Sequence, residues 1–130
     1  MKRSVLIIDD EQITVEAARE MLEPYFKLLF AIETRTGMNL ALRHQPDLIL
    51  LDLKMPKLDG FEFIEAYRNA ADDDMPFIVM SSDTSDATKQ RAKELGVQYF
   101  IEKPLNPTFL PLAVEAIFER LDLQKQQGNQ

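Results

Sequence analysis

Short apolar runs alternate with helix-type patterns along the whole chain of 130 residues. The runs with the length and composition of buried strands are 5–8, 27–32, 48–51, 77–80 and 99–101. Each is followed by a segment with helical spacing of apolar residues, and these segments are 11–22, 37–44, 61–70, 85–95 and 108–124. Five strand–helix units in succession predict an α/β protein with a parallel sheet, right-handed crossovers and helices on both faces.

Prolines and glycines predict where the helices end. Pro24 and Pro46 close the first two helices, and Gly96 is the C-terminal stop of the fourth. Pro111 fits only the first turn of a helix, where backbone amides lack intrahelical partners, so the last helix is expected to begin near Thr108. Residues 126–130 are polar and are expected to form a frayed tail or the start of a linker after a single domain at 1–125.

Charge and composition exclude several classes of function. The net charge of −7 disfavours non-specific binding to nucleic acid or to an anionic membrane. The chain has no cysteine, which excludes disulfides, thiol nucleophiles and cysteine metal sites. No apolar run approaches the length of a membrane span, and Asp9 and Asp10 interrupt the first run too early for a signal peptide. We therefore expect a cytoplasmic protein that contacts neither nucleic acid nor membrane directly.

Carboxylates follow two of the predicted strands. Asp9 and Asp10 come directly after the first apolar run, and Asp52 comes after the third. The carboxyl ends of parallel strands share one edge, where open α/β sheets bind their ligands. Carboxylates crowded there raise their own pKa values unless a cation joins them, so the sequence predicts a divalent metal and chemistry on Asp52. Helix capping is the alternative role for Asp9 and Asp10, and the two roles can coexist.

Four sequence pieces, each after a predicted strand, form a specific pattern. They are Asp9-Asp10-Glu11, Asp52 with Met55-Pro56 and Asp59-Gly60, Ser81, and Lys103-Pro104. Over residues 3–122 this pattern resembles the receiver domain of two-component response regulators. The resemblance implies a doubly wound, flavodoxin-like (CheY-like) fold, with a five-stranded parallel sheet in the order 2-1-3-4-5 and five helices.

The resemblance also implies roles for individual residues. Asp52 would be the phosphoacceptor, and Asp9, Asp10, Asp52 and the backbone carbonyl of Lys54 would hold Mg²⁺, a cation that prefers hard oxygen ligands. Lys103 would reach the phosphoryl group as a compact charge. A cis Lys103–Pro104 bond would hold that lysine inward. The alternative for Lys103 is a surface lysine before a turn proline.

Two further residues would take part in switching. Ser81 would donate its hydroxyl to a phosphoryl oxygen, and strand phase favours Ser81 over Ser82; an ordinary hydroxyl turn is the alternative. Phe100 occupies the place of the family's switch aromatic, with a static core phenylalanine as the alternative. Near the predicted path of attacking water, a pair between Lys54 and Asp83 would slow the loss of phosphate.

The loop after Asp52 and one other feature have structural interpretations. Met55, Pro56, Asp59 and Gly60 would shape the loop, with Gly60 permitting a turn that other residues resist. His44, the only histidine, sits at a helix end and is expected on the surface.

The last predicted helix is apolar on two sides. One stripe is assigned to the core and consists of Leu110, Val114, Ile117, Phe118 and Leu121. A second stripe is interpreted as a contact for an effector or a second copy of the chain, and it consists of Phe109, Leu112, Ala116 and Leu123. Scattered exposed apolar residues are the alternative for the second stripe.

The pattern therefore predicts a receiver that accepts a phosphoryl group from a histidine kinase or a histidine phosphotransfer protein. Such a receiver is not an enzyme with a separate substrate, and it would switch a face made by helix four, strand five and helix five. Two alternatives remain. A phosphatase of the haloacid dehalogenase type would need a second aspartate at position 54, where the chain has Lys54. A pseudo-receiver used only for binding would not need Ser81, Lys103 and the three aspartates.

Overall fold

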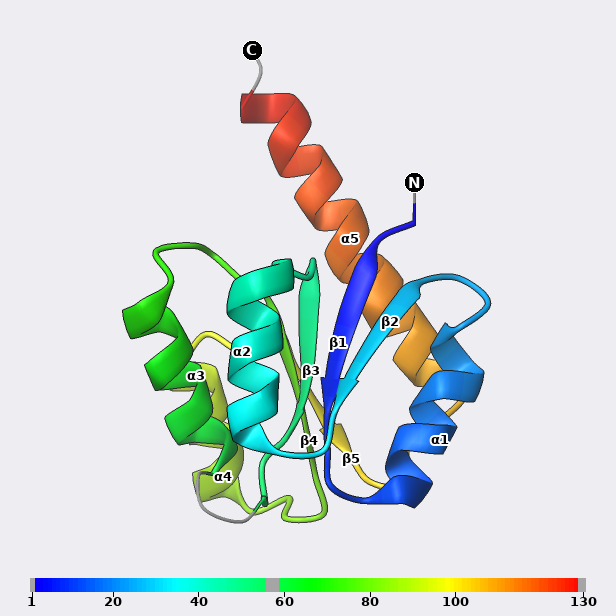
Figure 1. Ribbon diagram of the computed structural model, residues 1–130, viewed down its shortest axis with the longest axis vertical. Coiled ribbons are helices and arrows are strands. Elements are labelled where there is room, and N and C mark those ends of the chain that lie inside the picture. The colour runs from blue at the N-terminus through cyan, green and yellow to red at the C-terminus, as the bar shows by residue number, and fades with distance from the viewer. Residues whose placement is uncertain (1, 56–58, 129–130) are drawn as a thin grey trace.

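A parallel sheet of five strands forms the centre of the protein (Figure 1). The computed structural model describes residues 2–55 and 59–128. The strands are β1 (Ser4–Ile8), β2 (Lys27–Ala31), β3 (Leu48–Asp52), β4 (Phe77–Ser81) and β5 (Tyr99–Glu102). They lie in the order β2-β1-β3-β4-β5 and all neighbours are parallel, which confirms the predicted fold class and strand order.

Helices cover both faces of this sheet (Figure 1). They are α1 (Gln12–Leu22), α2 (Thr34–His44), α3 (Gly60–Ala70), α4 (Asp86–Glu94) and α5 (Phe109–Gly128). One core cluster contains side chains of α1 and α5, and the other contains side chains of α2, α3 and α4. Alternate residues of β1 divide between them, because Val5 and Ile7 enter the first cluster while Leu6 and Ile8 enter the second. A strand covered on both faces is apolar at successive positions.

Most predicted boundaries agree with the structure to within one residue, but α2 is an exception. It begins at Thr34, three residues before the predicted start at Gly37. A Cβ on Gly37 would lie 2.6 Å from Cδ1 of Ile8. Gly37 lies inside the helix, and because it has no Cβ it lets α2 approach β1 closely. His44 ends α2 and is exposed, as predicted.

The second exception is the end of α5. The prediction that the helix stops at 124 and that the tail from 126 lies outside it is wrong, because α5 continues to Gly128. Residues 124–127 are lysine and glutamine, which are good helix formers, and no proline or glycine occurs among them. The start agrees with prediction: Pro111 lies in the first turn, and the Asn106 side chain accepts hydrogen bonds from the amides of Thr108 and Phe109 at 2.8 Å each. The proposed domain end at residue 125 stays a prediction.

None of the helices among the described residues is long and apolar enough to span a bilayer. The cytoplasmic location remains a prediction.

Candidate functional site

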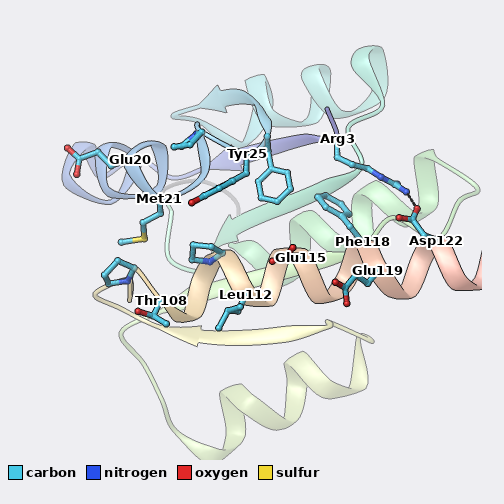
Figure 2. A pocket seen from close by; sticks show the side chains of 14 residues that line it. Arg3, Glu20, Met21, Tyr25, Thr108, Leu112, Glu115, Phe118, Glu119 and Asp122 are labelled. Atoms are coloured by element: carbon cyan, nitrogen blue, oxygen red, sulfur yellow. Dashed lines mark hydrogen bonds and ion pairs between the residues drawn. The ribbon is translucent and has the colours of Figure 1, made fainter. Parts of the chain in front are cut away.

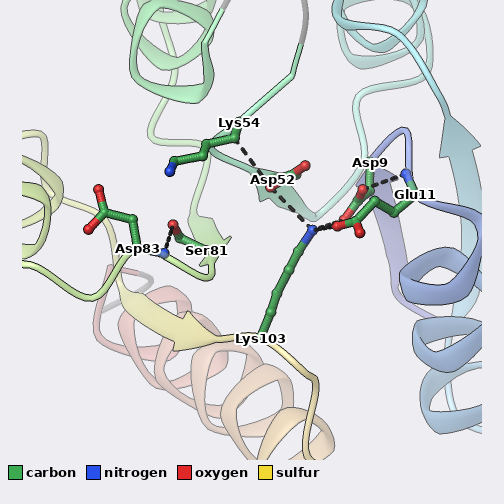
Figure 3. Close-up of polar contacts among 7 residues, drawn as sticks. All are labelled: Asp9, Glu11, Asp52, Lys54, Ser81, Asp83 and Lys103. Carbon is green, nitrogen blue, oxygen red and sulfur yellow. Dashed lines mark hydrogen bonds and ion pairs between the residues drawn. The ribbon is translucent and has the colours of Figure 1, made fainter.

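Four polar side chains gather at the carboxyl edge of the sheet (Figure 3). Asp9 directly follows β1, Asp52 and Ser81 are the last residues of β3 and β4, and Lys103 directly follows β5. In the parallel register, Asp52 lies beside Met80, and Ser81 lies beside Glu102. The sheet topology thus brings together residues that are far apart in the sequence.

The predicted carboxylates form one cluster. Asp9, Asp10 and Asp52 each offer an oxygen, and these oxygens lie within 4.8 Å of one another. Asp9 is fully buried, Asp52 is 3% exposed and Asp10 is exposed. Oδ1 of Asp9 accepts a hydrogen bond from the Glu11 amide at 2.8 Å. Helix capping by the aspartates is not supported, because the N-cap of α1 is Glu11 and no side chain caps it.

Lys103 projects into the cluster and contacts three carboxylates (Figure 3). Its Nζ lies 2.9 Å from Oδ2 of Asp9 and 3.3 Å from Oδ1 of Asp52, and it donates a hydrogen bond to Oε1 of Glu11. The lysine side chain is only 9% exposed, and the predicted cis Lys103–Pro104 bond is confirmed. The Glu11 contact was not predicted. Its only sequence signal is its place two residues after Asp9, where α1 begins.

Burial and charge shift the protonation equilibria of this cluster. Burial, and then the charge of Asp9, raise the pKa of Asp52 to about 6, although Lys103 and the Lys54 amide act in the opposite direction. For Lys103, burial lowers the pKa. The hydrogen bond to Glu11 and the close carboxylates of Asp9 and Asp52 outweigh that effect and raise the pKa. The site therefore holds a firmly charged ammonium beside carboxylates that it does not fully neutralise.

The donor set fits a hard divalent cation. All three clustered side chains offer oxygen, the ligand atom that Mg²⁺ prefers. Oδ2 of Asp9 is buried, and among the described residues it accepts no hydrogen bond, the Lys103 ammonium being close but not in hydrogen-bonding geometry. Burial, and then the charge of Asp9, raise the pKa of Asp52, so a bound cation would favour its ionised form. The Lys54 carbonyl as a ligand stays a prediction; the observed contact is its amide, which donates to Asp52 Oδ1 at 3.3 Å.

Ser81 connects the site to α4. Its side chain is buried while Ser82 is exposed, as strand phase predicted. Ser81 Oγ accepts a hydrogen bond from the Asp83 amide at 2.9 Å. The Asp83 carboxylate accepts in turn from the Ser85 amide at 2.9 Å and from the Thr88 hydroxyl at 2.8 Å. These hydrogen bonds lower the pKa of Asp83.

The expected pairing of Lys54 with Asp83 is not formed, since the structure has no ion pair between these two described residues. Figure 3 shows Lys54 extended toward the side of the site where Asp83 lies. The physical reason is that the Asp83 carboxylate is engaged by the start of α4. The charge of Lys54 is the smallest cause of the lowered pKa of Asp83.

The loop after Asp52 ends in a capped helix. Asp59 and Glu62 form a capping box at the start of α3, with the Asp59 side chain accepting from the Glu62 amide at 2.9 Å. A Cβ on Gly60 would lie 2.8 Å from Cα of Leu53, so close packing requires this glycine. Its φ is not positive, so the predicted need for a turn that other residues resist is wrong. Met55 is buried, and the predicted role of Pro56 concerns a position outside the described residues.

Phe100 is half-buried and packs against the core on the side of α2, α3 and α4. This environment is compatible with both interpretations of Phe100, so its switch role stays a prediction.

The two stripes of α5 differ in burial. Leu110, Val114, Ile117 and Phe118 are buried as predicted, Leu121 is half-buried, and the sequence analysis missed the buried Ala113. The members of the second stripe lie outside the core: Phe109 (48% exposed), Leu112 (58%), Leu123 (59%) and the half-buried Ala116. Two of its members have different neighbours. The ring of Phe109 packs edge-on against Tyr99 of β5, with centroids 6.4 Å apart, whereas Leu112 lines a groove on the α1 side.

Comparisons with known proteins agree with this geometry. Residues 5–115 match the model of the response regulator receiver domain. The response regulator GtcR of Aneurinibacillus migulanus is 31% identical over 121 residues, which cover 92% of this chain and 49% of GtcR. The polar-differentiation response regulator DivK of Brucella anthropi is 29% identical, with 85% of this chain and 92% of DivK covered.

A solved structure gives the same result. The receiver domain of AraT, a response regulator from Geobacillus stearothermophilus, superposes with a TM-score of 0.84 at 30% identity, covering 96% of this chain and 99% of that chain. This chain spans about half the length of several curated relatives that it matches. The family model covers most of the chain, and the strand order is that of a CheY-like fold. The chain belongs to the receiver domains of two-component response regulators.

Proposed function

We propose that Asp52 accepts a phosphoryl group from a phosphohistidine of a histidine kinase or a histidine phosphotransfer protein. The observation that carries this proposal is the nearly buried Lys103 ammonium, which lies within 3.3 Å of both Asp9 and Asp52 at the carboxyl edge of the sheet. A surface lysine before a turn proline would have no reason to enter an acidic pocket. The domain would be the substrate of the kinase rather than an enzyme with a separate substrate.

The transfer itself is a displacement at phosphorus. A carboxylate oxygen of Asp52 attacks, the new P–O bond forms, the P–N bond of the phosphohistidine breaks, and the imidazole nitrogen keeps the electron pair. Asp52 must be ionised to attack, and its pKa of about 6 leaves it mostly ionised at neutral pH. Bound Mg²⁺, with Asp9, Asp10, Asp52 and the predicted Lys54 carbonyl as ligands, would supply positive charge near the phosphoryl oxygens.

Lys103 and Ser81 would stabilise the product. A phosphoryl group brings a charge of about −1.5 to −2 into a pocket that is already acidic. The Lys103 ammonium already lies at ion-pair distance from three carboxylates, so one of these contacts must be released. Glu11 is the partner that can move, because its side chain is 59% exposed while those of Asp9 and Asp52 are buried. Among the described residues Ser81 Oγ accepts one hydrogen bond and donates none, which leaves its proton free for a phosphoryl oxygen.

This rearrangement would reach α4, β5 and α5. Ser81 is joined through Asp83 to Ser85 and Thr88 at the start of α4, so a new partner for Ser81 biases that helix. Phe100 lies on β5 and packs against the core on the side of α2, α3 and α4. Its side chain would reorient when Ser81 changes its partner. The side chains of Phe109, Leu112, Ala116 and Leu123, which lie outside the core, would offer an effector or a second copy a contact on α5. The coupling free energy between phosphorylation of Asp52 and binding at the face of α4, β5 and α5 is expected to be about 1–3 kcal/mol.

A phosphotransfer assay tests the proposal. The chain is incubated with Mg²⁺ and phosphoramidate, a small donor with the same P–N bond, and intact mass reports the added group. The unmodified chain and the control Asp74→Ala, an exposed turn residue, should be phosphorylated, whereas Asp52→Ala and any sample with excess chelator should not. No adduct on the unmodified chain would favour a pseudo-receiver. Continuous hydrolysis of phosphomonoesters would favour the phosphatase alternative.

A further inference from the structure

A groove of about 1090 Å³ runs between α1, the segment 24–26 and α5 (Figure 2). Its apolar lining includes Met21, Tyr25, Leu112 and Phe118. Phe118 is buried at the base, where its ring meets that of Phe26 edge-on, while Tyr25 and Leu112 are 62% and 58% exposed. Tyr25 and Leu112 thus lie at the sides of an open groove and are not part of the buried core.

The charged part of the lining is mostly acidic. Four carboxylates and one guanidinium line the groove. The guanidinium, Arg3, is already paired with Asp122 and stacks on the Phe118 ring at 5.2 Å. Glu20, Glu115 and Glu119 form no ion pair with any other described residue. The groove therefore combines apolar contacts with three uncompensated negative charges.

The dimensions fit a helix. The lining extends from Thr108, directly before α5, to Asp122 within it, which at 1.5 Å per residue is a length of about 21 Å, or nearly four helical turns. Leu112, Glu115 and Glu119 follow one another at helical spacing along this wall, as a helix laid alongside would require.

We propose that this groove binds a basic amphipathic helix of a partner protein. Apolar side chains of that helix, spaced one turn apart, pack against Met21, Tyr25 and Leu112, as in other helix-in-groove complexes. Lysine or arginine side chains on its flanks pair with Glu20, Glu115 and Glu119, and the net charge of −7 steers the positive segment toward the protein. A second copy of the chain fits less well, because a symmetric contact through this groove would bring the same three carboxylates together.

Leu112 and Leu123 provide a matched test of the apolar contacts. Both are leucines on α5 with nearly equal exposure, but only Leu112 lines the groove. The probe is a fluorescein-labelled helical peptide of about 15 residues, with leucine on one face and lysine on the flanks, titrated with the full chain and followed by anisotropy. Leu112→Glu should weaken binding about tenfold or more, and Leu123→Glu less than about twofold. If circular dichroism shows that Leu112→Glu does not fold, Tyr25→Ser takes its place.

A second pair of variants tests the charges. Glu115→Lys with Glu119→Lys should weaken binding several-fold and flatten its salt dependence, whereas Asp72→Lys with Asp74→Lys, at an exposed turn elsewhere, should change it little. Absence of binding by the lysine peptide overturns the proposal, as does equal affinity for a peptide with glutamate in place of lysine. Equal effects of Leu112→Glu and Leu123→Glu also overturn it. A dimer that Leu112→Glu dissociates would identify a second copy as the occupant instead.

Discussion

The helices α4 and α5 lie on opposite faces of the sheet beside β5, and they are held in different ways. The core side chains that α5 buries are Leu110, Ala113, Val114, Ile117 and Phe118. Among its nine residues α4 buries only Ala92. Burying a large apolar side chain stabilises a fold by about 1.5–3 kcal/mol. Packing therefore fixes α5, while α4 depends on other contacts.

Those other contacts are polar and lie near the surface. Arg68 of α3 donates to the carbonyl oxygen of Leu95, just after α4, and Arg91 pairs with Glu65 at 3.3 Å and lies 5.0 Å from the centre of the Phe61 ring. Exposed ion pairs contribute only about 0–1 kcal/mol each. The less firmly held helix is also the one whose first turn is hydrogen-bonded to Asp83 beside the site. Segments that change state are drawn from such low-stability parts of a fold.

The largest expected effect concerns the core side of α5. Ile117→Ala should lower the free energy of unfolding by about 2–5 kcal/mol, because the fully enclosed site loses apolar contact and is left with a cavity. Urea unfolding followed by circular dichroism measures this change. Leu123→Ala is the matched control on the same helix and should cost less than about 1 kcal/mol, since Leu123 is 59% exposed. Equal losses in the two variants would show that packing does not distinguish α5.

The second largest expected effect concerns Asp52 in the site, where burial of an ionised side chain lowers the free energy of unfolding instead of raising it. The pKa of Asp52 rises from 3.8 to about 6 in the folded protein. Between these values the folded state binds more protons than the unfolded state, so the contribution of Asp52 to stability falls as the pH rises through this window. Above pH 6 the ionised side chain is unfavourable in the metal-free protein.

Asp52→Asn should therefore gain stability relative to the unmodified chain as the pH rises. We expect the difference between the two unfolding free energies to change by roughly 1–3 kcal/mol in favour of Asp52→Asn between pH 4 and pH 7.5, in chelator. Chemical denaturation at several pH values gives this difference. Asp74→Asn, at an exposed turn, serves as the control and should show no such trend. A difference that stays constant with pH would show that Asp52 ionises normally.

The difference between local sequence signals and tertiary contacts explains which features the sequence could predict. The parallel sheet and the gathering of Asp9 and Asp52 follow from apolar runs and parallel topology, which are local and strong signals. The strand order and the inward position of Lys103 were implied by the family resemblance. The start of α2 was missed because Gly37 is a tertiary requirement, set by contact with Ile8. In the same way, the lack of a Lys54–Asp83 pair depends on the hydrogen bonds of Asp83 to α4. Such competition between partners has no signature in the residue pattern.

The third effect tests the attachment of α4 directly. Ser85 is the N-cap of α4, and its side chain accepts from the Thr88 amide. Ser85→Ala should cost about 1 kcal/mol, the usual loss for a removed cap. Because α4 opens locally, we expect amide hydrogen exchange to become about fivefold faster within α4, while amides of α5 around Ile117 keep their rates. Equal acceleration in α5 would mean that the two helices unfold together and that the comparison fails.

The smallest effect isolates the ion pair between α3 and α4. Glu65→Gln removes the partner of Arg91 but keeps the size of the side chain, and both groups are about half exposed. We expect exchange in α4 to accelerate by less than about threefold at low salt and not at all at 1 M salt, where screening already weakens the pair. Glu16→Gln, which breaks the Arg19 pair within α1, is the control and should leave α4 unchanged. A large effect of Glu65→Gln would show that charge, and not the cap or the burial of Ala92, is the main attachment of α4.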